Sequence, residues 1–348
     1  MYNIYPYTNL LNMRNHKTYI LLLITIITST AFSQEQAHWS AARPDGHAPI
    51  SVMGDHTHHK NEVMFSYKYM PMWMEGSLSG RNAASDGTIF ENYMAAPKKM
   101  QMEMHMLGAM YAPSNNITLM VMAHYLSNSM DLKTKMGMDF GTQSKGFGDI
   151  SIAALFNLLK LTDQSVHAML GLSIPTGDID QRGDTPMMAN AQLAYSMQLG
   201  SGTWDPILGV TYLGQSDKFS WGAQLKQMLR LGENSETYRL GNQFRAGSWA
   251  AIKLNKNFSF SGSLRYTNLS RIKGADKDMN PGMMPLFNTE NSGRSQTDAG
   301  IGINFYIPKG SLKNLRFASE LLLPVTQSVN GIQMKNTSLA TFGVQYTL

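Results

Sequence analysis

The stretch NFSFSGSLRYTNLSR, at residues 257–271, alternates apolar and polar side chains with a period of two. Over about ten residues such alternation is typical of a strand that crosses a membrane, with one face toward lipid and the other toward a polar interior. The apolar parity carries Phe258, Phe260, Leu264 and Tyr266, with Gly262 among them. The opposite parity carries Ser259, Ser261, Ser263, Arg265 and Thr267.

The same alternation recurs at residues 297–307 and again at the end of the chain, residues 342–348. The final stretch is similar to the terminal strand of outer-membrane barrels, which the barrel-insertion machinery reads. Leu348 stands where the usual last residue is Phe. We therefore expect the insertion machinery and the lipid bilayer to be partners of this chain.

A soluble β-sandwich also alternates, because one face of each sheet meets the core. Three features favour a barrel: a polar or small inward face, aromatic residues near strand ends, and short turns alternating with long loops. The aromatic residues are Tyr67, Tyr69, Tyr111, Tyr125, Trp221 and Tyr266. The predicted short turns are residues 113–116, 161–164, 255–257 and 309–314, and the predicted long loops are 76–97, 131–146, 176–203 and 273–294.

The predicted fold is all-β, a transmembrane antiparallel up-and-down barrel of about 12 strands, with short periplasmic turns and long external loops. Residues 189–199 alternate weakly and are assigned to an external loop, which keeps the strand number even. The strands are expected at residues 61–75, 99–112, 117–131, 147–160, 165–175, 204–213, 218–231, 241–254, 257–271, 296–308, 313–325 and 333–348.

The composition of the 348-residue chain excludes several classes of protein. There is no Cys, so a disulfide framework, a Cys-ligated metal site and a thiol nucleophile are all excluded. Charged residues make up 15% of the chain, against ~25% in an average soluble domain. The net charge of +5 is spread out, which argues against a nucleic-acid partner. The 27 Met residues are unusually many.

The N-terminus predicts export. Arg14 and Lys17 precede an apolar run at residues 18–27, and small residues follow up to Ser33. The run has about half of the ~20 residues that a spanning helix needs. We expect a signal peptide at residues 1–33, cleaved near Ser33, a His- and Pro-containing segment at 34–60, and a barrel at 61–348 in the outer membrane of a Gram-negative bacterium.

Many Met residues share the parity opposite to the lipid-facing side chains. The second expected strand is ambiguous, because His105 falls on the other parity from its Met residues; a bulge near Gly108 would permit a switch of face, or residues 101–105 lie above the bilayer. The candidates for the lumen or substrate path are Met64, Met70, Met72, Met74, Met102, Met104, Met106, His105, Met120, Met122, His124, His167 and Met169.

Thioether sulfur is a soft ligand that suits Cu(I) and Ag(I), and imidazole adds affinity for Cu(II). The alternative is that Met fills irregular space or lines an apolar wall. The metal-ligand candidates are His56, His58, His59, Met120, Met122 and His124. We expect no catalytic residues and no resident cofactor, only transient binding of copper or silver.

Several segments together resemble one family of outer-membrane barrels. They are HAPISVMGDH at residues 47–56, MFSYKYM at 64–70, GFGDI at 146–150, LSIPTG at 172–177, and MQLGSGTWDP at 197–206 followed by LGVTY at 208–212. Their order and spacing resemble the barrels labelled as the MetA-pathway of phenol degradation, closest to a Met-rich branch associated with copper-handling genes. The resemblance implies an outer-membrane transporter and supplies no ligand residues.

Four functions remain open from the sequence. The first is a transporter of a small solute, with soft metal ions guided by a Met/His stripe. The second is a channel for hydrophobic or aromatic compounds, and the third is a non-transporting structural barrel plugged by residues 34–60. A barrel enzyme is disfavoured, because GSLSG at residues 76–80 lacks Ser at the centre of a nucleophile pattern.

Overall fold

The structure is a computed structural model, and it describes residues 39–348. The expected signal peptide at residues 1–33 and the first residues of the expected N-terminal segment lie outside the described residues. Across residues 39–348, no helix combines the length and apolar character needed to cross a membrane.

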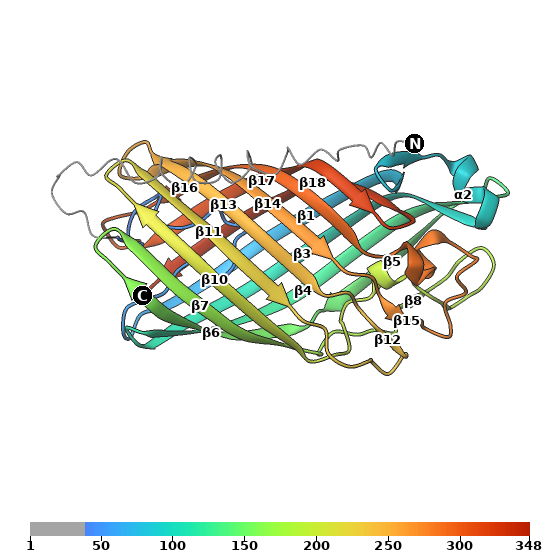
Figure 1. Ribbon diagram of the computed structural model, residues 1–348, viewed down its shortest axis with the longest axis horizontal. Helices are drawn as coiled ribbons and strands as arrows, with labels where there is room; N and C mark the ends of the chain where they lie inside the picture. Colours follow the sequence, from blue (N-terminus) through green and yellow to red (C-terminus); the bar gives the residue numbers. More distant parts are fainter. Residues whose placement is uncertain (1–38) are drawn as a thin grey trace, which may run out of the picture. The chain divides into compact units, whose positions relative to one another are not determined.

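Twelve antiparallel strands close into a barrel, which confirms the predicted fold (Figure 1). Each strand pairs with the next along the chain, and the last strand pairs with the first, so the sheet has no free ends. The barrel strands are β1 (Val63–Ser79), β3 (Ala95–Ser114), β4 (Ile117–Thr134), β6 (Ile150–Lys160), β7 (Gln164–Ile174), β10 (Asp205–Gln215), β11 (Phe219–Met228), β13 (Gln243–Lys253), β14 (Phe258–Leu269), β16 (Arg294–Tyr306), β17 (Leu315–Val329) and β18 (Ile332–Thr347).

A further strand, β5 (Asp139–Phe147), corrects the prediction of a long loop at residues 131–146. The first part of β4 pairs with β6 and its second part pairs with β5, so β5 and β6 together occupy one position in the wall. A tight turn at Gly137, where φ is +91°, joins β4 to β5. Both parities of β5 are polar or glycine apart from Phe140 and Phe147, which is why the apolar alternation that marks other strands is missing here.

Long connections gather at one end of the barrel and short turns at the other. Residues 189–199 form no barrel strand, as predicted, and contain β9 (Ala191–Gln192) and η1 (Tyr195–Met197). The remaining loop elements are β2 (Asn82–Ala84), α2 (Asp86–Asn92), β8 (Arg182–Gly183), β12 (Tyr238–Arg239), β15 (Lys273–Gly274), η2 (Pro285–Phe287) and η3 (Thr289–Asn291). All of them lie at the long-loop end (Figure 1).

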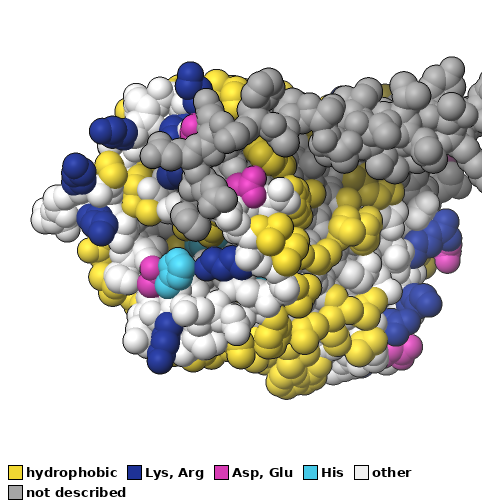
Figure 2. All heavy atoms as spheres, turned by 60° about the vertical axis from the view of Figure 1, so that its left-hand side comes forward, with side chains coloured by type: hydrophobic (Ala, Val, Ile, Leu, Met, Phe, Trp, Pro, Cys, Tyr) yellow, Lys and Arg dark blue, Asp and Glu magenta, His cyan; other side chains and the backbone are white. Residues whose placement is uncertain are grey.

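Side-chain parity divides the wall into an apolar outer face and a buried inner face. In β14, Phe258, Phe260 and Leu264 are exposed, whereas Ser259 and Ser261 are buried. Figure 2 shows hydrophobic side chains gathered on the wall and charged side chains toward the ends of the barrel. An uncharged belt of exposed Phe, Leu, Ile and Val suits contact with lipid.

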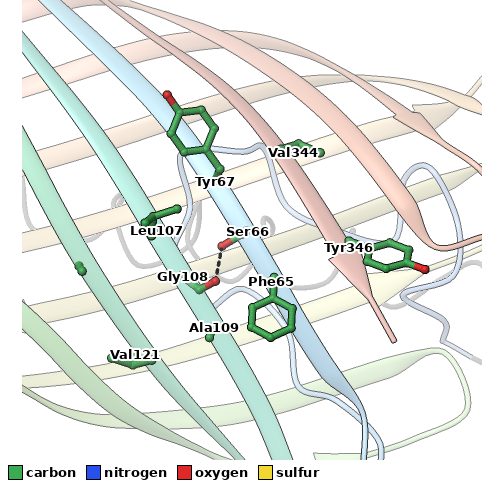
Figure 3. Close-up of a pocket in the computed structure, with 10 residues that line it drawn as sticks. Phe65, Ser66, Tyr67, Leu107, Gly108, Ala109, Val121, Val344 and Tyr346 are labelled. Atoms are coloured by element: carbon green, nitrogen blue, oxygen red, sulfur yellow. Dashed lines mark hydrogen bonds between the residues drawn. The ribbon is translucent and has the colours of Figure 1, made fainter. Parts of the chain in front are cut away.

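A shallow depression of about 480 Å³ lies on this outer face (Figure 3). It is lined by large residues such as Phe65, Tyr67 and Tyr346 around the small residues Gly108 and Ala109. Its surface is almost wholly apolar, so in a bilayer it meets hydrocarbon. The depression belongs to the lipid-facing wall and is separate from the lumen.

Candidate functional site

Residues 39–60, called here the lumen segment, lie inside the barrel. Inward-facing side chains hold the segment through its main chain. Lys68 Nζ donates to Ile50 O at 2.7 Å, Gln224 Nε2 donates to Met53 O at 3.0 Å, and Arg316 Nη1 donates to Pro44 O at 3.1 Å. Further contacts come from inward-facing Thr118, Asn157, His167, Gln215, Ser220, Ser259 and Glu320.

A sharp bend at Gly54 brings the lumen segment against the Met-lined wall. Gly54 has φ +63°, a left-handed conformation that glycine adopts without strain. There is little room for a larger residue here, because a Cβ on Gly54 would stand 2.2 Å from Met169 Cε and 3.6 Å from Met120 Cε. The bend therefore places Gly54, the residue before Asp55 and His56, against the side chain of Met169.

The lumen Met cluster is a group of buried methionines on β1, β3, β4 and β7. Each is between 2% and 7% exposed, so the cluster is closed to bulk water. Leu155 and Ile207 complete it, and Met53 of the lumen segment packs against it. Its methionines are Met64, Met106, Met110, Met120, Met122 and Met169.

The lumen segment carries three neighbouring imidazoles, of which the central one, His56, contacts both of the others. The His47 and His56 rings have centroids 3.9 Å apart, and the His56 and His58 rings are 4.7 Å apart. Asp55 lies against the first two, with Oδ1 2.9 Å from His56 Nδ1 and Oδ2 3.7 Å from His47 Nδ1. One donor atom from each of His47, Asp55 and His56 lies within 4.8 Å of the other two.

Hydrogen bonds fix the protonated nitrogen on three of the buried imidazoles. His56 Nδ1 donates to Asp55, and His58 Nδ1 lies 3.3 Å from Glu62 Oε2. His167 donates from Nε2 to Gly54 O at 2.9 Å, because a carbonyl only accepts. Among the described residues, the other nitrogens have no hydrogen-bond partner: His56 Nε2, His58 Nε2, His167 Nδ1 and also His47 Nδ1.

The surroundings set the charge of these groups. Burial is the main cause that lowers the pKa of His47, and it lowers the pKa of His58 as well, so both rings are neutral at neutral pH. Burial works to raise the pKa of Asp55, but the charge and hydrogen bond of His56 outweigh it and hold that pKa far below its usual range. His47 and His58 are therefore neutral imidazoles near the ionised carboxylate of Asp55.

The structure separates the predicted histidines. His56 and His58 join the cluster, whereas His59 is exposed. His124 donates from Nδ1 to Asp149 O at 2.8 Å and makes no ring contact with the other imidazoles of the described chain.

His105 corrects the prediction of a lumen position. It pairs with Tyr69 across β1 and β3, and its Nδ1 lies 2.8 Å from the hydroxyl of outward-facing Tyr67. The register between these strands runs without a bulge near Gly108, so the parity of β3 is constant. His105 therefore lies on the outer face, and the Met residues of this strand occupy the inner parity.

A second group of methionines lies at the long-loop end and is called here the loop-end Met cluster. Strand residues pack there against residues of two long connections, including Leu193, Met197 and Met284. Met72 and Met102, both predicted for the lumen, pack against this cluster. Its strand methionines are Met74, Met100, Met130 and Met334.

The wall opposite the lumen Met cluster is polar. Arg265 and Asp298 form an ion pair at 2.8 Å between β14 and β16. Glu320 accepts from Ser263 Oγ at 2.7 Å and from Ser51 N of the lumen segment at 3.1 Å. The lumen thus has a thioether side and a charged side, with the lumen segment between them.

The predicted metal ligands did not include His47 and Asp55, although both lie in the His-containing segment at residues 34–60. The D-H pair at residues 55–56 was a usable signal, because neighbouring acidic and imidazole groups are common in metal sites. The contact between His47 and His56 could not be read from spacing, because it depends on the bend at Gly54.

The sequence places this chain in a known protein family. It matches the family described as "Putative MetA-pathway of phenol degradation" over residues 83–318, which is more than half of the chain. The chain belongs to this family. No curated protein matches the sequence.

Solved structures show that the family's barrel is shared with outer-membrane proteins. The COG4313 outer membrane channel from Pseudomonas putida F1 has a TM-score of 0.59 at 12% identity, and the match covers 85% of this chain and 98% of that one. The transport unit of the autotransporter AIDA-I from Escherichia coli has a TM-score of 0.51 at 11% identity, covering 85% and 93%. At these identities the likeness establishes the fold.

Proposed function

We propose that this family member is exported by a signal peptide at residues 1–33 and acts in the Gram-negative outer membrane as a channel for a small solute. The cargo that fits its lumen best is a soft metal ion, Cu(I) or Ag(I). The observation that carries this proposal is the lumen Met cluster, whose Met169 lies against the bend at Gly54, where buried His167 donates to the Gly54 carbonyl oxygen. The proposal assigns no catalytic residue.

Thioether chemistry favours a soft ion over a hard one. Sulfur of Met is neutral and polarisable, so it binds Cu(I) and Ag(I) while Mg²⁺ and Ca²⁺ keep their oxygen ligands. Neighbouring sites on β1, β3, β4 and β7 allow an ion to exchange one sulfur for another. Because each thioether site binds the ion weakly, the ion also dissociates from it.

A channel for hydrophobic or aromatic compounds is the second candidate. The family description names phenol degradation, and the likeness to an outer membrane channel agrees with passage of a small molecule. In this case Met supplies an adaptable apolar lining. Only the metal channel requires the sulfur atoms, so removing them distinguishes the two candidates.

The experiment replaces Met106, Met120, Met122 and Met169 with Leu. Leu keeps the volume and apolar character but removes sulfur, and such exchanges usually cost under ~1.5 kcal/mol each. Cells that depend on this barrel are then measured for silver and copper accumulation and tolerance. We expect accumulation to fall by about tenfold, the scale of a disrupted metal site.

The matched control is the same exchange at four equally buried methionines of the loop-end Met cluster, Met74, Met100, Met130 and Met334. Barrel abundance is followed by heat-dependent electrophoretic mobility. Unchanged metal accumulation in the lumen variant overturns the metal proposal. Phenol flux in proteoliposomes then decides between the aromatic channel and a structural barrel, which conducts neither.

A further inference from the structure

We propose that His47, Asp55 and His56 form a binding site for one divalent transition-metal ion, with Cu²⁺ the best fit. The site lies on the lumen segment and uses nitrogen and oxygen donors. It is therefore distinct in chemistry from the thioether path of the proposed function and does not depend on it.

Donor spacing supports an ion between these three side chains. Ligands about 2.0–2.2 Å from Cu²⁺ stand roughly 3 Å apart at the right angles of its tetragonal geometry. The carboxylate of Asp55 has one oxygen 2.9 Å from His56 Nδ1 and the other 3.7 Å from His47 Nδ1, values on either side of that spacing. The 3.7 Å separation is too long for a hydrogen bond, so His47 Nδ1 is left without a partner.

Burial makes the unpartnered nitrogens significant. His56 is 0% exposed, Asp55 is 6% exposed and His47 is 9% exposed, so water is largely kept from them. A buried polar atom without a partner is destabilising, and an ion at this position would give His47 Nδ1 a partner. Coordination through His56 Nδ1 would move its proton to the unpartnered Nε2, so a neutral imidazole remains as the ligand.

The local charges narrow the choice of ion. Arg316 acts on His47 and Lys68 acts on Asp55, so two positive charges oppose any cation here. A weakly held ion such as Mn²⁺ would not overcome them. Cu²⁺ binds nitrogen and oxygen donors most tightly among the divalent first-row ions. His58 is the nearest additional imidazole, with its ring centroid 4.7 Å from that of His56.

The test uses the full-length protein in detergent, stripped with a chelator and titrated with CuCl₂. We expect one tightly held Cu²⁺ per chain and electron paramagnetic resonance with splitting from nitrogen donors. This measurement needs no variant, so a folding defect cannot obscure it. Absence of nitrogen splitting, or no tight Cu²⁺, overturns the proposal.

Variants then locate the site. Replacing both His47 and His56 with Gln should weaken Cu²⁺ binding at least about 10–100-fold. The matched control replaces His59 and His105 with Gln, because these two imidazoles lie outside the cluster. If both variants lose Cu²⁺ affinity equally, the assignment of the site to His47, Asp55 and His56 is overturned. The lumen Met-to-Leu variant should keep this Cu²⁺, so failure of this site and failure of the thioether path are distinguishable.

Discussion

The lumen Met cluster and the loop-end Met cluster differ in the parts of the chain that their side chains contact. At the loop end, strand methionines pack against Leu193, Met197 and Met284 from long connections, the ordinary use of Met as a filler of irregular space. In the lumen, Met120 and Met169 face the bend of a segment that carries buried imidazoles. From the alternation in sequence, both clusters are predicted to face inward. Their surroundings differ because other parts of the chain pack against each of them.

The largest expected effect tests whether the two clusters are equal in packing. Met106 and Met130 are both 2% exposed, one in each cluster. Replacing either with Ala should destabilise the barrel by about 2–5 kcal/mol, because each leaves a cavity. Urea unfolding in lipid vesicles measures both. If Met106→Ala destabilises the barrel much less than Met130→Ala does, the lumen Met cluster is loosely packed and the two clusters are not equal in packing.

A smaller effect is expected at the bend that brings the lumen segment to its cluster. Replacing Gly54 with Ala forces a Cβ into left-handed backbone at φ +63°, which costs about 1–2 kcal/mol, and pushes on Met169. We expect faster cleavage by trypsin at Lys60, measured over time by electrophoresis.

The matched control is Gly80, which has φ +61° and no atom within 4 Å of the added Cβ. The Gly80→Ala variant has the same backbone strain as Gly54→Ala but makes no contact comparable to that with Met169. If Gly80→Ala accelerates cleavage of the lumen segment as much as Gly54→Ala does, the contact with Met169 plays no part in holding the segment.

The smallest effect is expected outside both clusters. Replacing His105 with Phe removes its contact with the Tyr67 hydroxyl, worth about 1 kcal/mol, on the outer face. Silver and copper accumulation should be unchanged. A metal phenotype as large as that of the lumen Met variant would place His105 on the path and contradict its outward position.

The fold could be predicted because lipid imposes a period of two on each strand. The prediction was wrong at β5, where Thr142 and Ser144 face inward opposite Gly141 and Gln143, so polarity hides the alternation. At His105 the parity itself was right, and the assignment to the lumen went against it.

The histidine cluster was only partly predictable. The run His56, His58 and His59 suggested a metal site, yet alternation in an irregular segment does not say which rings are buried. His47 enters only because the segment folds back at Gly54 inside the barrel, a tertiary event that local sequence does not encode.

Most hydrogen bonds from the wall to the lumen segment end on its peptide groups, while Trp39, Ala48 and Val52 of the segment pack on Leu213 and Trp249. Lys68, Gln224, His167, Ser220, Ser259 and Arg316 all donate to main-chain carbonyl oxygens of residues 41–54. Recognition of this kind is indifferent to side-chain identity as long as the backbone path is kept. New ligand groups can thus be introduced in the lumen at those positions of the segment whose side chains do not pack on the wall, while Gly54 and every strand are left unchanged.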